Sequence, residues 1–161
     1  MSGVSGEDLW IAYYAAPLTG ASPGSLMAVR RNAPSWASAI TAQQREPGGL
    51  EGRFGEAVRD ELPDSELAAL AAGEVLSHRL GTARDELAAM SSFGARLAEI
   101  VTAAVISRWD GRPPSALLSA VRGGRTTWGS LLHRQGIAPE EAENRIGVLL
   151  GRSPPDHRAK P

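Results

Sequence analysis

One carboxylate stands within the most apolar part of the chain. Between Leu97 and Ile106 the polar side chains are those of Glu99 and Thr102. A buried, unpaired carboxylate is costly, and burial raises its pKa. Because carboxyl groups with shifted pKa values are candidate acids and bases, Glu99 is a candidate catalytic residue, with Arg96 as a candidate ion-pair partner one turn earlier. On an exposed strip beside Arg96, Glu99 would have no such role.

Arginine supplies nearly all of the positive charge. Of the 17 basic residues, Lys160 is the single lysine and the others are arginine. The guanidinium fork binds carboxylates and phosphates at two points, so a surplus of arginine is a possible sign of anion binding. The arginines are scattered along the whole chain, however, which the codon bias of a GC-rich genome also explains.

A glycine turn near the C-terminus is the best candidate for such an anion site. Gly123 and Gly124 lead through Arg125 and Thr126 into a predicted helix that starts near Thr127. Free N–H groups at a helix start, together with an arginine, can hold an anion. Gly124, Arg125 and Thr126 are therefore candidate anion-binding residues. The turn lacks the spacing and the lysine of a phosphate-binding P-loop, so an ordinary turn and helix cap is the alternative.

Two tryptophans with arginines close by in the sequence could mark an interaction surface. Tryptophan and arginine are enriched among the residues that dominate binding energy at interfaces. The candidate interaction patch comprises Arg108, Trp109, Arg112, Arg125 and Trp128. The alternative is that these tryptophans pack at the edge of the core with the indole N–H turned outward.

Several chemistries lack the residues they need. The chain has no cysteine, which excludes a disulfide framework, a thiolate nucleophile and a cysteine-based zinc site. Its three histidines are far apart. Glu74 and His78 share a helical face, but a helical di-iron site needs a Glu-x-x-His spacing on two helices. No serine lies in a Gly-x-Ser-x-Gly elbow. We expect no metal and no cofactor.

Charge and hydropathy also limit the partners. The formal net charge is −1, which argues against charge-driven binding to nucleic acid or to a membrane surface. Apolar stretches of about ten residues are too short to span a bilayer. Residues 1–8 lack the basic and apolar regions of a secretory signal. We therefore expect a cytoplasmic protein with no membrane and no nucleic-acid partner.

The C-terminal helices resemble a helix-turn-helix in spacing, with apolar residues at Leu131, Leu132 and Ile137 around Gly136. In such a motif the start of the second helix faces the DNA bases. Here that start carries three carboxylates, Glu140, Glu141 and Glu143. DNA phosphates would repel them, so a DNA-binding regulator ranks last among the predicted functions.

The apolar periodicity predicts an all-α, single-domain bundle of five to seven helices around a long central helix, Ala83–Asp110. Short strands at Leu9–Ala16 and at Leu97–Ile106 remain open alternatives, because short apolar runs fit both structures. Residues 1–8 are expected to be a flexible N-terminus and residues 151–161 a flexible tail. Between them lies one helical domain, 9–150, with a main body (9–110) and a small C-terminal helical unit (115–150).

These observations favour a non-catalytic accessory or protein-interaction protein that binds another protein or a second copy of itself. The alternative is a small enzyme or ligand-binding protein with an apolar helical pocket. In that alternative Glu99 is a shielded acid or base, and an arginine binds an anionic group of the ligand.

Overall fold

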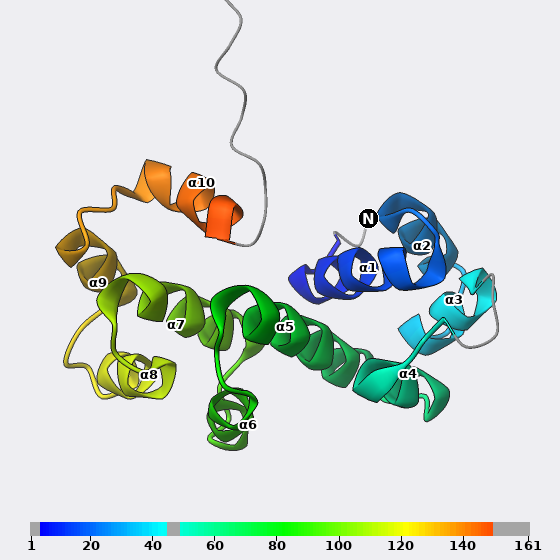
Figure 1. The fold of residues 1–161 in the computed structure, drawn as a ribbon, viewed down its shortest axis with the longest axis horizontal. Coiled ribbons are helices and arrows are strands. Elements are labelled where there is room, and N and C mark those ends of the chain that lie inside the picture. The colour runs from blue at the N-terminus through cyan, green and yellow to red at the C-terminus, as the bar shows by residue number, and fades with distance from the viewer. Residues whose placement is uncertain (1–3, 45–48, 150–161) are drawn as a thin grey trace, which may run out of the picture. The chain divides into compact units, whose positions relative to one another are not determined.

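The computed structural model describes residues 4–44 and 49–149, and every regular element within these ranges is an α-helix. In chain order (Figure 1) they are α1 (Gly6–Thr19), α2 (Pro23–Arg30), α3 (Trp36–Gln43), α4 (Gly52–Arg59), α5 (Asp64–Leu80), α6 (Arg84–Ser92), α7 (Leu97–Asp110), α8 (Pro114–Arg122), α9 (Trp128–Arg134) and α10 (Pro139–Leu149). The predicted all-α class is confirmed. The tail predicted for residues 151–161 lies outside the described residues.

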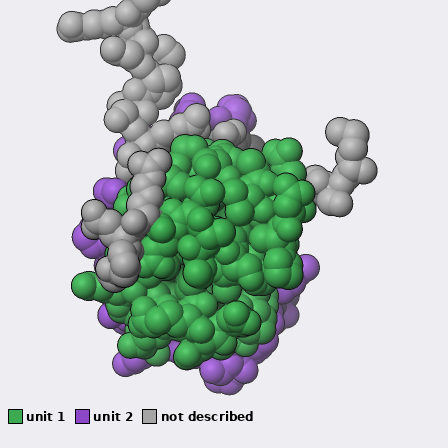
Figure 2. Space-filling view, turned by 90° about the vertical axis from the view of Figure 1, so that its right-hand side faces the viewer, with its two compact units in different colours: residues 1–74 green, residues 75–161 purple. Residues whose placement is uncertain are grey.

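The helices group into two compact units, unit 1 (residues 1–74) and unit 2 (residues 75–161), which Figure 2 colours separately. The boundary falls inside α5, between Glu74 and Val75. Unit 1 thus contains α1 to α4 and the first part of α5, and unit 2 contains the rest of α5 and α6 to α10. The Pro113-Pro114 pair, which lies between the predicted main body (9–110) and the predicted C-terminal helical unit (115–150), is inside unit 2.

The first helix begins earlier than predicted. Ser5 Oγ accepts a hydrogen bond from the Asp8 backbone N–H at 3.1 Å, and Asp8 Oδ2 accepts one from the Ser5 backbone N–H at 3.0 Å. This reciprocal capping box makes residues 5–8 the start of α1 and not part of a flexible terminus. The strand alternative for Leu9–Ala16 is also wrong, because the buried residues of α1 follow helical spacing: Ile11, Ala12, Ala15, Ala16 and Thr19.

Trp36 joins three other segments of unit 1. Its side chain is fully buried. The indole Nε1 donates to Asp8 Oδ1 at 2.7 Å, and the backbone N–H of Trp36 donates to Asp64 Oδ1 at 2.9 Å. Asp64 Oδ2 in turn accepts from Arg30 Nη2 at 2.7 Å. One tryptophan at the start of α3 thereby connects the starts of α1 and α5 and, through Asp64, the end of α2.

The single long helix predicted for Ala83–Asp110 is instead two helices, α6 and α7. Gly94 has φ +72°, the left-handed conformation that glycine adopts at helix ends. The Ala95 N–H bonds back to the Met90 carbonyl at 3.1 Å, which closes α6. The apolar pattern did not reveal this break, because Met90 and Ile100 on either side of it belong to the same buried cluster.

In unit 2, α7 packs against α6, α8 and α9, and α9 contacts α10. The main buried cluster consists of Leu76, Leu80, Leu87, Met90, Ile100, Ala103, Ala104, Val105 and Leu118. A second cluster consists of Ile106, Leu117 and Leu131. The stretch from Leu97 to Ile106 is therefore a helix that contributes to both clusters, and the strand alternative for it is wrong.

Candidate anion-binding site

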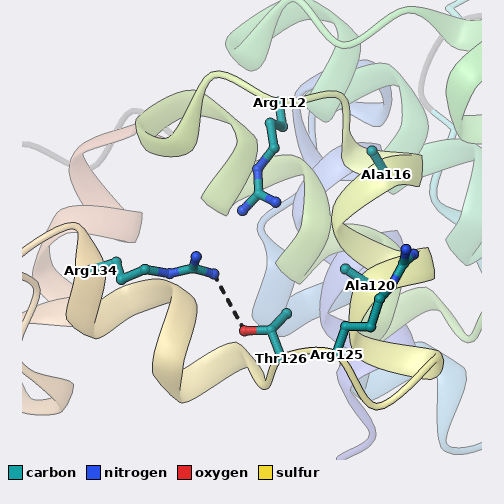
Figure 3. A pocket seen from close by; sticks show the side chains of 6 residues that line it. All are labelled: Arg112, Ala116, Ala120, Arg125, Thr126 and Arg134. Carbon is teal, nitrogen blue, oxygen red and sulfur yellow. Dashed lines mark hydrogen bonds between the residues drawn. The ribbon is translucent and has the colours of Figure 1, made fainter.

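Three arginines from three segments line one pocket of unit 2. Arg112 lies between α7 and α8, Arg125 lies between α8 and α9, and Arg134 ends α9. The pocket has a volume of about 350 Å³, and its other lining residues are Ala116, Ala120 and Thr126. Figure 3 shows the guanidinium groups of Arg112 and Arg134 pointing into the space beside α8, while Arg125 runs along α8 next to Ala120.

Helix ends determine where the first two arginines lie. Gly111, with φ +80°, ends α7, and Pro114 begins α8. Arg112 therefore lies in the short connection between the glycine that ends one helix and the proline that begins the next. After α8 the chain turns at Gly124, which has φ +69°. The Arg125 backbone N–H then donates to the Ala120 carbonyl at 2.9 Å, which holds the turn against α8.

The third arginine reaches the pocket through the two turns of α9. Thr127 caps this helix, since its Oγ1 accepts from the Ser130 backbone N–H at 3.1 Å. Arg134 lies at the far end of the helix, and its long side chain extends back along it. There Arg134 Nη2 donates to Thr126 Oγ1 at 3.4 Å, the contact drawn in Figure 3.

Arg112 is held by an acid on α7. Its Nη2 donates to Asp110 Oδ2 at 2.9 Å, and its Nε donates to Asp110 Oδ1. These hydrogen bonds from Arg112 lower the pKa of the Asp110 carboxyl group, so it stays ionised at neutral pH. The Arg112 carbonyl also accepts from Ser107 Oγ at 2.6 Å. Two side chains of α7 thus fix the position of this arginine.

Positive charge exceeds negative charge at the pocket. Neither Arg125 nor Arg134 forms an ion pair with any residue that the structure describes, and both are exposed. Three guanidinium groups on its lining and the one carboxylate of Asp110, which forms its ion pair with Arg112, give the pocket a net charge of +2. Guanidinium groups match the geometry of carboxylates and phosphates, so an oxyanion is the ligand class that this arrangement suits.

The structure brings together some of the residues singled out in the sequence. Arg112 and Arg125 of the candidate patch, and Thr126 of the candidate anion site, line the pocket, and Gly124 forms the turn beside it. Arg108 is exposed and is not a lining residue. Arg134 was not predicted as a site residue. Its spacing from the glycine turn, two turns of helix after Thr127, was the signal that could have identified it.

The two tryptophans of the candidate patch lie at the edge of the core. Trp109 and Trp128 are half-buried, and each packs against both buried clusters of unit 2. This is the core-edge packing that was the alternative for them. They therefore support the helices that carry the arginines, and each remains partly exposed.

The environment of Glu99 is not the one expected for a shielded acid or base. Its Oε2 accepts from Arg122 Nη2 at 2.8 Å and from the Arg96 backbone N–H at 2.9 Å. The hydrogen bond from Arg122, followed by that from Arg96, lowers the pKa of Glu99 to about 2. The expected effect of burial was a raised pKa. The Arg96 side chain is 87% exposed, and its Nε lies 3.7 Å from Glu99 Oε2, so Arg122 is the main ion-pair partner of Glu99.

A second pocket, of about 400 Å³, is mainly apolar and is lined by Gly129, Leu132, His133, Gly136, Ile137 and Ala138. Glu99 is not among the residues that line this pocket or the arginine pocket. The geometry therefore does not place the candidate acid or base in either of these cavities.

Within the described ranges, no three His, Asp or Glu side chains gather as metal ligands would. None of the described helices combines the length and the apolar character that crossing a bilayer requires.

Comparison of the chain with protein-family models, with curated proteins and with solved structures gives no match.

Proposed function

We propose that this chain is a non-catalytic protein-interaction protein, and that unit 2 binds an acidic segment of a partner protein through Arg112, Arg125 and Arg134. The observation that carries this proposal is the single pocket that these arginines line, with its net charge of +2. Arginine is enriched at protein interfaces and binds carboxylates at two points. With no observation that favours acid–base chemistry at Glu99, binding is the better supported role. A cytoplasmic location is part of the proposal.

The test uses a short, fluorescently labelled, glutamate-rich peptide and measures its binding to the purified chain by fluorescence anisotropy. The pocket variant carries Arg125→Gln and Arg134→Gln, and we expect it to bind about tenfold more weakly, because two charge-assisted contacts are lost. The control variant carries Arg31→Gln and Arg53→Gln. Both of these arginines are exposed in unit 1, so the net charge changes equally while the pocket stays intact.

Two results would contradict the proposal. If both variants lose binding equally, the peptide follows net charge and not the pocket. If the chain forms a dimer in sedimentation experiments, and the pocket variant alone loses it, the acidic partner is a second copy of this chain. The exposed Glu140 and Glu141 at the start of α10 would then be the acids to examine.

A further inference from the structure

The charge of the pocket is larger than one carboxylate can neutralise. Arg112 is balanced by Asp110, whereas neither Arg125 nor Arg134 forms an ion pair with a described residue. A glutamate or aspartate side chain brings a single negative charge. A phosphate monoester brings about −1.5 to −2 at pH 7 and three terminal oxygens that accept hydrogen bonds. Its charge therefore matches the +2 of the pocket.

The positions of the arginines also suit a tetrahedral group. The three side chains come from the α7–α8 connection, from the α8–α9 connection and from the end of α9. The guanidinium groups of Arg112 and Arg134 point into the space beside α8, and Arg125 runs along α8 and would turn toward this space to meet a ligand (Figure 3). A planar carboxylate offers both of its oxygens in one plane. A phosphate ester offers three oxygens that point in different directions, and each can accept from a separate guanidinium group.

Two of these three arginines are already held in position. Asp110 holds Arg112 at two points, and Thr126 Oγ1 accepts from Arg134. A group positioned before binding loses less conformational freedom on binding. The Thr126 hydroxyl accepts from Arg134 and still has its own proton to donate to an anion. Arg125 is exposed, and its side chain makes no hydrogen bond with a described residue, so it can turn toward a ligand.

Small side chains on α8 leave room for the ligand. Ala116 and Ala120 are four residues apart and therefore lie on one face of the helix, where both line the pocket. A volume of about 350 Å³ is near the lower end of ligand pockets, which suits one phosphorylated side chain. A larger residue at the exposed Ala116 would fill this space without changing any charge.

We infer that the pocket formed by Arg112, Arg125 and Arg134 recognises a phosphate monoester on a serine side chain of the partner protein. This inference rests on the proposed function, because it names the acidic group that the partner supplies. The phosphate oxygens accept from the three guanidinium groups and from the Thr126 hydroxyl, and no bond is made or broken.

Three labelled peptides of one sequence test this inference, with phosphoserine, glutamate or serine at the central position. We expect the phosphoserine peptide to bind at least about tenfold more tightly than the glutamate peptide, since it offers the larger charge and one more oxygen. The pocket variant and an Ala116→Leu variant should both lose this preference, whereas the Arg31→Gln/Arg53→Gln control should keep it. Circular dichroism of each variant verifies that it is folded.

Each alternative result has a defined meaning. Equal binding of the phosphoserine and glutamate peptides would overturn the phosphate inference and leave the proposed function standing. No binding of either peptide would overturn both. Inorganic phosphate serves as a competitor, and if it binds as tightly as the phosphoserine peptide, the ligand is a free phosphate compound and the partner peptide is not its source.

Discussion

The Arg122 guanidinium and the Glu99 carboxylate form a two-point ion pair between residues 23 apart in sequence, with Nε 3.2 Å from Oε1 and Nη2 2.8 Å from Oε2. The same guanidinium donates to the carbonyls of Phe93 and Gly94, at 3.0 and 2.9 Å. These carbonyls follow the last turn of α6, where exposed C=O groups carry partial negative charge. Arg122 therefore joins the ends of α6, α7 and α8.

Replacing Glu99 by glutamine should weaken this junction. The substitution removes the charge that holds Arg122 but keeps the size of the side chain, and the Glu99 side chain is only 18% exposed. We expect the free energy of unfolding in urea to fall by about 1 kcal/mol, the lower range for a charged hydrogen bond near solvent. Glu56→Gln, at an exposed position of α4, is the control and should change little. Equal losses for both substitutions would show that the junction contributes nothing.

The stability of the chain should decrease in acid, and Glu99 should account for part of the decrease. Its pKa is about 2 in the folded chain against an ordinary value of 4.5. A carboxyl group whose pKa is lowered by folding stabilises the fold above its ordinary pKa, and this contribution is lost as the pH falls from 4.5 toward 2. The pKa values of Asp8 and Asp110 are also lowered, which gives the same sign.

Urea unfolding of the unmodified chain and of the Glu99→Gln variant between pH 7 and pH 2.5 measures this contribution. The two curves of stability against pH should lie apart at pH 7 and approach each other as the pH falls from 4.5 toward 2.5, because the carboxylate of the unmodified chain then progressively loses its advantage over the amide. A constant difference across the whole range would mean that the effect of the substitution has nothing to do with the charge of Glu99.

Replacing either of two helical glycines by alanine should change the stability of the chain, in opposite directions at the two positions. At Gly55 in α4, a Cβ atom would lie 2.1 Å from the Leu50 carbonyl oxygen and 2.5 Å from its carbon. These are backbone atoms, so the chain must shift. Gly55→Ala should therefore cost about 2–3 kcal/mol, the upper part of the usual range for overpacking. At Gly129 in α9 the nearest atom would be Thr127 Oγ1 at 3.9 Å, so Gly129→Ala should stabilise by about 0.5–1 kcal/mol.

Thermal or urea unfolding of these two variants, each compared with the unmodified chain, measures whether Gly55→Ala lowers and Gly129→Ala raises the free energy of unfolding. A stabilising Gly55→Ala would mean that Leu50 lies elsewhere in solution. A destabilising Gly129→Ala would mean that the start of α9 needs the freedom of glycine.

Local signals in the sequence predicted much of the fold. Ser35 directly precedes α3, and its Oγ accepts from the Ser38 backbone N–H as an N-cap residue does. The helix predicted to start near Thr127 does start there, as α9, and Thr127 caps it. A helix cap depends on a few adjacent residues, so the sequence contains the whole signal. By contrast, the break at Gly94 interrupts a stripe of apolar residues that continues on both sides, so periodicity alone did not locate it.

The candidate site shows the same division between local and distant contacts. Arg125 and Thr126 could be singled out because they follow a glycine turn in the sequence. The pairing of Glu99 with Arg122 could not, because it depends on how α7 and α8 pack. Arg96, the neighbour favoured by helical spacing, is a minor partner because its side chain points largely into solvent.

Removing the Asp64 carboxylate should destabilise unit 1 more than an ordinary surface change does. In Asp64→Ala the first N–H of α3, at Trp36, loses its partner, and the Arg30 guanidinium loses its ion pair. The Nε of Arg30 is already buried without a partner among the described residues, so the bond from Nη1 to the Ala33 carbonyl, at 2.9 Å, is what remains to this guanidinium. We expect a loss of about 2–3 kcal/mol in the free energy of unfolding. Asp60→Ala, at an exposed position after α4, is the control and should stay within about 0.5 kcal/mol. If the two variants unfold at the same urea concentration, water replaces Asp64 at no cost and the buried Trp36 does not depend on it.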